Sequence, residues 1–129
     1  MNLRNDLFAV YKGKEYRLAI SKDDDLRLVS SDVADLKVGF FERSPGLYIL
    51  NVKKEDLESY YDIDTMARYK GYDFGVSAIE DDKILIWTNC DWHLAQKLGL
   101  EPQDKGIYGK WVKEEDLEKV WEEKSPLKL

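Results

Sequence analysis

Few features of this 129-residue sequence directly indicate a chemical activity or a cellular compartment. Its single cysteine, Cys90, excludes an internal disulfide and a zinc site built from cysteines, and scarce cysteine is typical of a reducing compartment. No apolar run approaches the roughly 18 to 20 residues that cross a bilayer. The N-terminus becomes polar and acidic before the apolar part of a signal peptide could form. We therefore expect a cytoplasmic protein that does not enter a membrane.

Basic residues are the minority among the charged side chains. Lys and Arg number 20 against 26 Asp and Glu, which gives a net charge of −6. A chain of that sign is repelled by phosphate backbones, so we expect no nucleic-acid partner. A hydrophobic fraction of 43% beside a charged fraction of 36% nevertheless indicates a folded globular chain rather than a disordered one.

Short stretches of sequence recur in the same order in the two halves of the chain. The first pair shares Ala, Tyr, Lys and Gly at matching positions, and the last shares Val-Lys and Glu-Asp-Leu-Glu. Because three blocks match collinearly at a nearly constant offset, the sequence predicts an internal duplication. The matching blocks are Phe8–Tyr16 with Met66–Phe74, Asp23–Leu28 with Asp81–Ile86, and Gly46–Glu58 with Gly106–Glu118.

Each half of the sequence is expected to form short strands. Gly13 supplies a hairpin turn, and Asp32 and Asp91 are expected to cap short helical segments, the second ending at Gly99. In the first half, strands are predicted at 8–12, 16–20, 26–30, 47–52 and 60–63, with one helical turn at 54–58.

This order of strands and turns resembles that of SH3-like barrels. The predicted fold is therefore mainly β with short helices: two tandem SH3-like units at residues 1–64 and 65–129, related by duplication. A single α+β domain is the alternative. Units of about 55 residues are marginal as independent domains. Packing of the two units as one body, with a shared core that includes Trp111 and Trp121, is therefore a further alternative.

Residues with catalytic or metal-binding chemistry are scarce. Cys90 lies three residues before the only histidine, His93, and on a helix the two would share a face, as a Cys-dependent enzyme needs. A partly buried thiol beside a capped helix is the favoured interpretation. The acidic clusters lack the spacing of a calcium loop, and Lys12-Gly13 and Lys70-Gly71 lie in hairpins rather than phosphate loops. We expect no catalytic residue, no metal and no cofactor.

Aromatic residues set among carboxylates are the strongest candidates for a binding surface. Aromatic anchors bury area at low entropic cost, while carboxylates steer a positively charged partner. This pattern predicts the recognition of a basic protein. The candidate residues are Tyr60, Tyr61, Asp62, Asp64, Tyr72, Asp73, Asp91, Trp92, Trp121 and Glu122.

The stretches Tyr11-Lys12-Gly13 and Trp111–Leu117 resemble small bacterial proteins of the immunity type, which accompany polymorphic or contact-dependent toxins. The resemblance implies a non-catalytic protein that binds and neutralises a basic toxin domain, often a nuclease. It assigns no role to individual residues. A tandem SH3-like adaptor that reads an extended peptide is the second hypothesis, and a Cys-dependent enzyme is the third.

Overall fold

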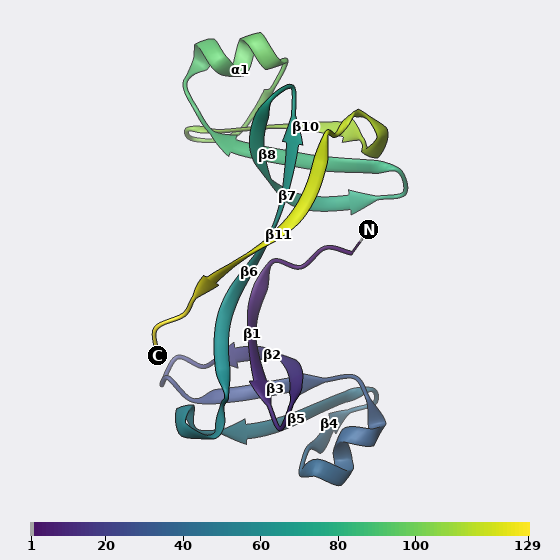
Figure 1. Ribbon diagram of the computed structural model, residues 1–129, viewed down its shortest axis with the longest axis vertical. Coiled ribbons are helices and arrows are strands. Elements are labelled where there is room, and N and C mark those ends of the chain that lie inside the picture. Colours follow the sequence, from purple (N-terminus) through teal and green to yellow (C-terminus); the bar gives the residue numbers. More distant parts are fainter. Residues whose placement is uncertain (1) are drawn as a thin grey trace. The chain divides into compact units, whose positions relative to one another are not determined.

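The computed structural model describes residues 2–129 and is mainly β, with short helices (Figure 1). This confirms the predicted fold class. The α+β alternative is wrong, because the only α-helix among residues 2–129, α1 (Trp92–Leu98), has seven residues. No helical segment in that range has the length and apolar character that crossing a membrane requires.

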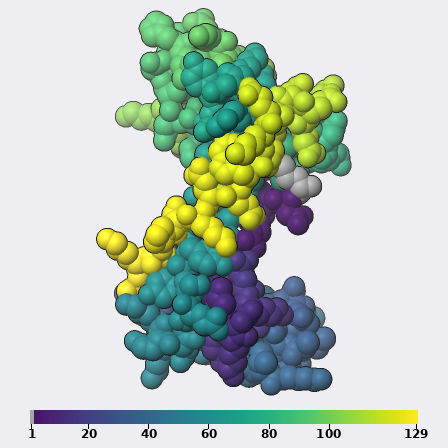
Figure 2. Space-filling view, viewed as in Figure 1, coloured from purple at the N-terminus to yellow at the C-terminus, as the bar shows by residue number. Residues whose placement is uncertain are grey.

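The chain divides into two compact units. One, here called the N-unit, consists of Asp6–Ile63 and Lys124–Leu129; the other, the C-unit, consists of Asp64–Glu123 and the residues up to Asn5. The two terminal segments are thus exchanged, which the prediction of 1–64 and 65–129 missed. Figure 2 shows the end of the chain, in yellow, at the surface of the N-unit.

The N-unit is an antiparallel sheet with two short 3-10 helices. Its strands are hydrogen-bonded in the order β4-β5-β3-β2-β1-β6. The elements are β1 (Asp6–Tyr11), β2 (Lys14–Ile20), β3 (Leu26–Ser30), η1 (Val33–Val38), β4 (Phe41–Ser44), β5 (Leu47–Val52), η2 (Lys54–Asp56) and the first half of β6 (Ser59–Tyr69).

The C-unit has the same kinds of element in the same order, except that α1 stands in place of the 3-10 helix η1. Its strands are paired in the order β6-β7-β8-β10-β9, and β11 also pairs with β6. Besides the second half of β6 and α1, the elements are β7 (Tyr72–Glu80), β8 (Lys83–Asn89), β9 (Glu101–Asp104), β10 (Ile107–Lys113), η3 (Glu114–Asp116) and the first part of β11 (Lys119–Pro126).

The hairpin turn in the first pair of matching blocks has the same backbone geometry in both units. Gly13 and Gly71 have φ values of 78° and 80°, which lie in the left-handed region that favours glycine. Each glycine N–H donates to a distant glutamate: Gly13 to Glu58 at 2.9 Å, and Gly71 to Glu118 at 2.7 Å. The blocks that match in sequence therefore make matching contacts in the two units. A duplication of the gene and kinship with SH3-like barrels remain predictions.

The predicted helix caps are confirmed. The carboxylate of Asp32 accepts from the Ala34 N–H in front of η1, and that of Asp91 accepts from the Leu94 N–H in front of α1. Gly99 ends α1 in a left-handed conformation. Strands β4 and β9 were not predicted, because all four residues of each are exposed and leave no alternation of polar and apolar positions.

Each unit has its own cluster of buried residues. Leu18, Leu28 and Phe40 belong to that of the N-unit, and Phe74 and Ile86 to that of the C-unit. The prediction that Trp111 contributes to a core is wrong, since this side chain lies on β10 and is 41% exposed. Its neighbour Val112 is buried in its place, because successive residues of a strand face opposite sides of the sheet.

Candidate functional site

Three of the predicted binding residues lie on β6 within the N-unit. Tyr60 packs against the core of the unit, so it is not available as an exposed anchor. The hydroxyl of Tyr61 donates to the carboxylate of Glu15, and the ammonium of Lys124 lies 4.5 Å from the Tyr61 ring centroid. Asp62 is half-buried. These side chains are largely engaged within the N-unit.

Asp73 and Trp121, in the C-unit, are joined by Arg68. Arg68 Nε donates to Asp73 at 2.8 Å, and its guanidinium carbon lies 5.7 Å from the centroid of the Trp121 ring. Lys119 lies over the same ring at 5.1 Å, and the indole N–H of Trp121 donates to Glu123. The hydrogen bond from Arg68 lowers the pKa of Asp73, which therefore stays ionised at neutral pH.

The remaining candidates in the C-unit are dispersed. Glu122 forms an ion pair with Arg4 at 2.9 Å. Asp91 is the N-cap of α1, and its carboxylate is occupied by the helix backbone. Trp92, the next residue, is 54% exposed and begins the helix. The predicted residues thus do not form one continuous surface within either unit.

The pairing of Cys90 with His93 that an enzyme would need is not found. Cys90 precedes the cap Asp91 and lies outside α1, so the expected helical face does not exist. The thiol packs against the core of the C-unit. Burial, and next the negative charge of Asp91, raise the pKa of Cys90, which is opposite to the shift of an activated nucleophile.

Metal binding finds no support in the described part of the chain. Within residues 2–129, no group of three or more His, Cys, Asp and Glu side chains is placed to hold a metal ion. The turn at 23–25, which carries three consecutive Asp residues, is closed by backbone hydrogen bonds between Ser21 and both Asp24 and Asp25. Its carboxylates belong to a turn, as the sequence predicted.

The C-unit has a hollow of about 520 Å³ on the outer face of its sheet. Two of the predicted residues line it, Asp64 and Asp73, whereas their neighbour Tyr72 does not. The other residues that shape it were not predicted. We call it the Trp87 hollow; its walls include Asn5, Asp64, Asp73, Gly75, Trp87 and Thr88.

Trp87 lies on β8 between two glycines of the neighbouring strands. Gly75 on β7 and Gly109 on β10 are its cross-strand partners. A Cβ at Gly75 would lie 2.6 Å from Cε2 and 2.8 Å from Cζ2 of the indole, so the ring lies directly on the bare backbone. The side chain of Gln103 covers Gly109. Trp87 is 37% exposed, so part of its ring remains in solvent.

The segment before β1 forms another wall of the hollow. Asn5 donates to the carbonyl of Val76 on β7 and accepts from the backbone N–H of Thr65 on β6. The Thr65 hydroxyl donates to the carbonyl of Arg4 and accepts from its N–H. These bonds fix the wall, because every polar group of the Asn5 side chain that faces the sheet has a backbone partner.

The charge in the Trp87 hollow has one sign. Asp64 and Asp73 are the ionisable residues that line it, and none of the described residues on its walls is basic. Asp73 is ionised, as its lowered pKa indicates. An aromatic ring beside carboxylates attracts cations, since the face of an indole is electronegative.

The matching row of the N-unit is built differently. In β2, β3 and β5 the corresponding cross-strand neighbours are Arg17, Val29 and Ile49. Side chains fill the positions that glycines occupy in the C-unit, and the Arg17 guanidinium pairs with Asp6 at 3.6 Å. The N-unit therefore has no aromatic platform in this row.

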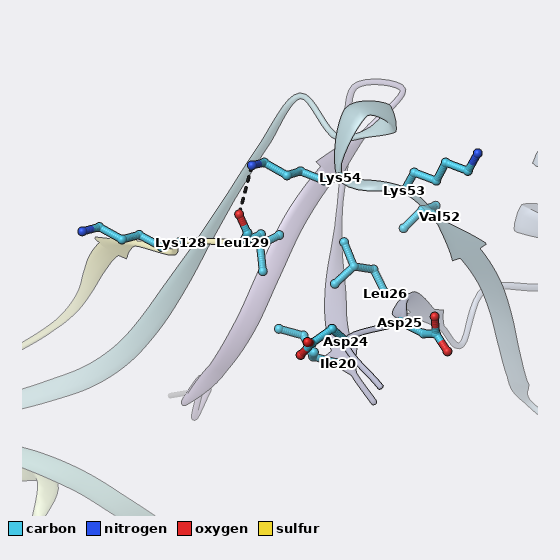
Figure 3. Close-up of a pocket in the computed structure, with 9 residues that line it drawn as sticks. All are labelled: Ile20, Asp24, Asp25, Leu26, Val52, Lys53, Lys54, Lys128 and Leu129. Carbon is cyan, nitrogen blue, oxygen red and sulfur yellow. Dashed lines mark hydrogen bonds between the residues drawn. The ribbon is translucent and has the colours of Figure 1, made fainter. Parts of the chain in front are cut away.

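The N-unit has a groove of its own, shown in Figure 3. Leu26 and Val52 form part of its floor, and Lys54 Nζ donates to the backbone carbonyl of Leu129 at 2.9 Å. Lys53 and Lys128 also line it, but Figure 3 shows their ammonium groups pointing away from the groove in different directions. Lys128 and Leu129, at the end of the chain, form part of the wall of this groove, and its lysines do not converge on an anion.

Comparison with known proteins places the chain in a family. Residues 3–128 match the family described as Uncharacterised conserved protein UCP033725. The chain belongs to this family. The match spans nearly the whole of both units. No curated protein and no solved structure matches the chain.

Proposed function

We propose that the chain is a non-catalytic protein that binds a basic protein partner, and that the Trp87 hollow is the centre of its binding surface. The observation that carries the proposal is a rigid, half-exposed indole in a concave site lined by two carboxylates and no basic side chain. Buried aromatic anchors dominate the energetics of protein interfaces, and complementary charge speeds the encounter.

The net charge of −6 supports the same partner, because long-range attraction favours a protein of opposite sign. In its more specific form, the proposal is an immunity protein that neutralises a basic bacterial toxin domain, such as a nuclease. The carboxylates of the hollow would then stand where a nuclease expects phosphates. The sequence resemblance to proteins of that type supports this form.

Calorimetric titration against a panel of basic toxin domains, with acidic domains of similar size as controls, tests the proposal. We expect binding to at least one basic domain and to no acidic one. Raising the salt from about 0.05 M to about 0.5 M should weaken the affinity, since exposed charges are screened within a few ångströms at high salt. If no basic domain binds, or if the affinity does not change with salt concentration, the proposal is overturned.

A further inference from the structure

The geometry of the Trp87 hollow points to an arginine side chain as the group that it receives. The guanidinium stacks on the indole of Trp87 and donates hydrogen bonds to the carboxylates of Asp64 and Asp73. This inference rests on the proposed function, and it adds the chemical identity of the residue that the partner must present.

The platform suits a flat group. The indole is pressed against the backbone of Gly75, where any side chain would collide with the ring. The part of the ring that lies against this backbone is covered, and part of the ring remains exposed. A planar guanidinium can stack on the face that remains, whereas the tetrahedral ammonium of lysine can only approach it as a point charge.

The carboxylates suit the same group. A guanidinium presents five N–H donors in a fixed fork and bonds carboxylates in pairs, which an ammonium cannot do. Asp73 uses its Oδ1 to accept from Arg68, and the hydrogen bond keeps the carboxylate ionised. The charged side chains on the described walls are carboxylates, of which Asp73 is paired with Arg68, so the hollow has no basic side chain of its own to hold an anionic ligand such as a nucleotide.

The C-unit already contains this arrangement once. Arg68 lies over the ring of Trp121 and donates to Asp73 at the same time. An arginine between an indole and a carboxylate is therefore a stable combination on this face of the sheet. Trp87 offers a second indole, which is 37% exposed, and Asp73 is shared between the two positions.

Three capped tripeptides test the inference on the full chain: acetyl-Gly-Arg-Gly-amide, its lysine analogue, and its citrulline analogue, which has nearly the same shape without the charge. Nuclear magnetic resonance of the four indole N–H groups reports where each peptide binds. We expect the arginine peptide to shift the Trp87 signal and leave that of Trp111 unchanged. The citrulline peptide should bind about tenfold more weakly, and the lysine peptide should fall between them.

Two variants and a matched control sharpen the result. Trp87→Ala should lower the affinity for the arginine peptide about tenfold, and Asp64→Asn should lower it without removing the platform. Trp111→Ala, which removes an indole exposed to a similar degree on the same unit, should change nothing. If Trp87→Ala proves unfolded, the peptide titration of the wild-type chain and Asp64→Asn still decide.

Equal binding of arginine and citrulline peptides, or shifts at Trp111 and not at Trp87, would overturn the inference. A basic domain that binds the wild-type chain and Trp87→Ala equally would also overturn it, and the proposed function would stand. Failure of all basic domains to bind would instead remove the proposed function, whatever the tripeptides show.

Discussion

The N-unit and the C-unit share a framework but differ at one buried position. Asp35 is 4% exposed in the N-unit, and Ala95, which like Asp35 lies four residues before the glycine that ends its helix, has no exposure in the C-unit. The N-unit also has a buried tyrosine, Tyr16, whose hydroxyl donates to Asp35 at 2.7 Å. The matching residue of the C-unit is Phe74, which is buried in the apolar core. A polar cluster in one interior is thus replaced by an apolar one in the other.

The polar cluster of the N-unit is fully paired. The carboxylate of Asp35 accepts from Tyr16, from Ser30 and from the ammonium of Lys14 at 3.1 Å. Burial acts to raise the pKa of Asp35, but these three donors outweigh it, and the pKa is lowered. The comparison teaches that the same backbone accepts either interior, provided that every polar member has a partner.

The two units also differ in one row of residues on the outer face of the sheet. The C-unit has the bare row Gly75, Trp87 and Gly109 where the N-unit has a filled row that includes Arg17. A framework common to both units cannot explain this difference, since each row is compatible with the same strand pairing. We therefore assign fold specification to the shared features and recognition to the row that the C-unit alone has.

The largest effect is expected from placing the N-unit's carboxylate in the C-unit. Ala95→Asp buries a charge beside Phe74 without the donors that Asp35 has, and a buried unpaired charge costs about 3 to 5 kcal/mol. All four tryptophans lie within Asp64–Glu123, so their fluorescence during urea unfolding reports this unit. Ala95→Ser, a smaller polar group, is the control. Wild-type stability in Ala95→Asp would show that the interiors are interchangeable.

Removing the buried carboxylate from the N-unit should lower its free energy of unfolding by a somewhat smaller amount. Asp35→Ala leaves the hydroxyls of Tyr16 and Ser30 without their acceptor, and we expect a loss of about 3 kcal/mol in the free energy of unfolding. Far-ultraviolet circular dichroism during urea unfolding measures it, while tryptophan fluorescence should change little. Asp32→Ala, which removes an exposed cap, should have a smaller effect. An unchanged N-unit would mean that the cluster contributes no net stability.

The pH dependence of stability should also separate the units. Burial, followed by the hydrogen bond to Asp35, raises the pKa of Tyr16 to about 12 from the ordinary value of 10.0. Folding favours the protonated hydroxyl, so its contribution is complete below pH 10 and is lost as the pH rises towards 12. Urea unfolding at a series of alkaline pH values should show this loss, and Tyr16→Phe should abolish it. A loss that persists in Tyr16→Phe would point to another group.

The smallest effects should be equal in the two units. Glu58→Ala and Glu118→Ala each remove the acceptor of a hairpin glycine N–H on the surface, and each should cost about 1 kcal/mol or less. Glu58→Gln and Glu118→Gln, which keep an acceptor, are the controls. Urea unfolding of the four variants, followed by tryptophan fluorescence and by far-ultraviolet circular dichroism, measures these losses. Markedly unequal losses would contradict the idea that the repeated words have the same role in each unit.

The framework could be predicted from the sequence because its signals are local. Gly13 and Gly71 mark their own hairpins, and Asp32 and Asp91 cap the segments that follow them. Strands such as Leu26–Ser30 and Leu47–Val52 have the predicted bounds because their patterns of type and burial agree. The exposed strands β4 and β9 were not predicted, and neither was the place of the terminal segments, since nothing in Lys124–Leu129 itself shows that it packs with the N-unit.

The hollow could not be predicted in the same way. Trp87 ends an apolar run and resembles part of a buried strand, and its exposure follows from a register that places Gly75 and Gly109 across from it. Register depends on pairing between distant segments, which single-sequence patterns do not define. A signal was nevertheless present: counted from the matched words, Gly75 corresponds to Arg17, a difference at the position that decides whether the row is filled.

The most direct test of the central claim uses the full chain, labelled with ¹⁵N, and an arginine-rich peptide such as acetyl-(Gly-Arg)₄-amide. Backbone and indole resonances are followed during the titration. We expect the signals of Gly75, Trp87 and Thr88 to move together and saturate, while those of the corresponding row in the N-unit, Arg17 and Val29, stay in place. Movement centred on the N-unit row, or weak shifts spread evenly over both units, would contradict it.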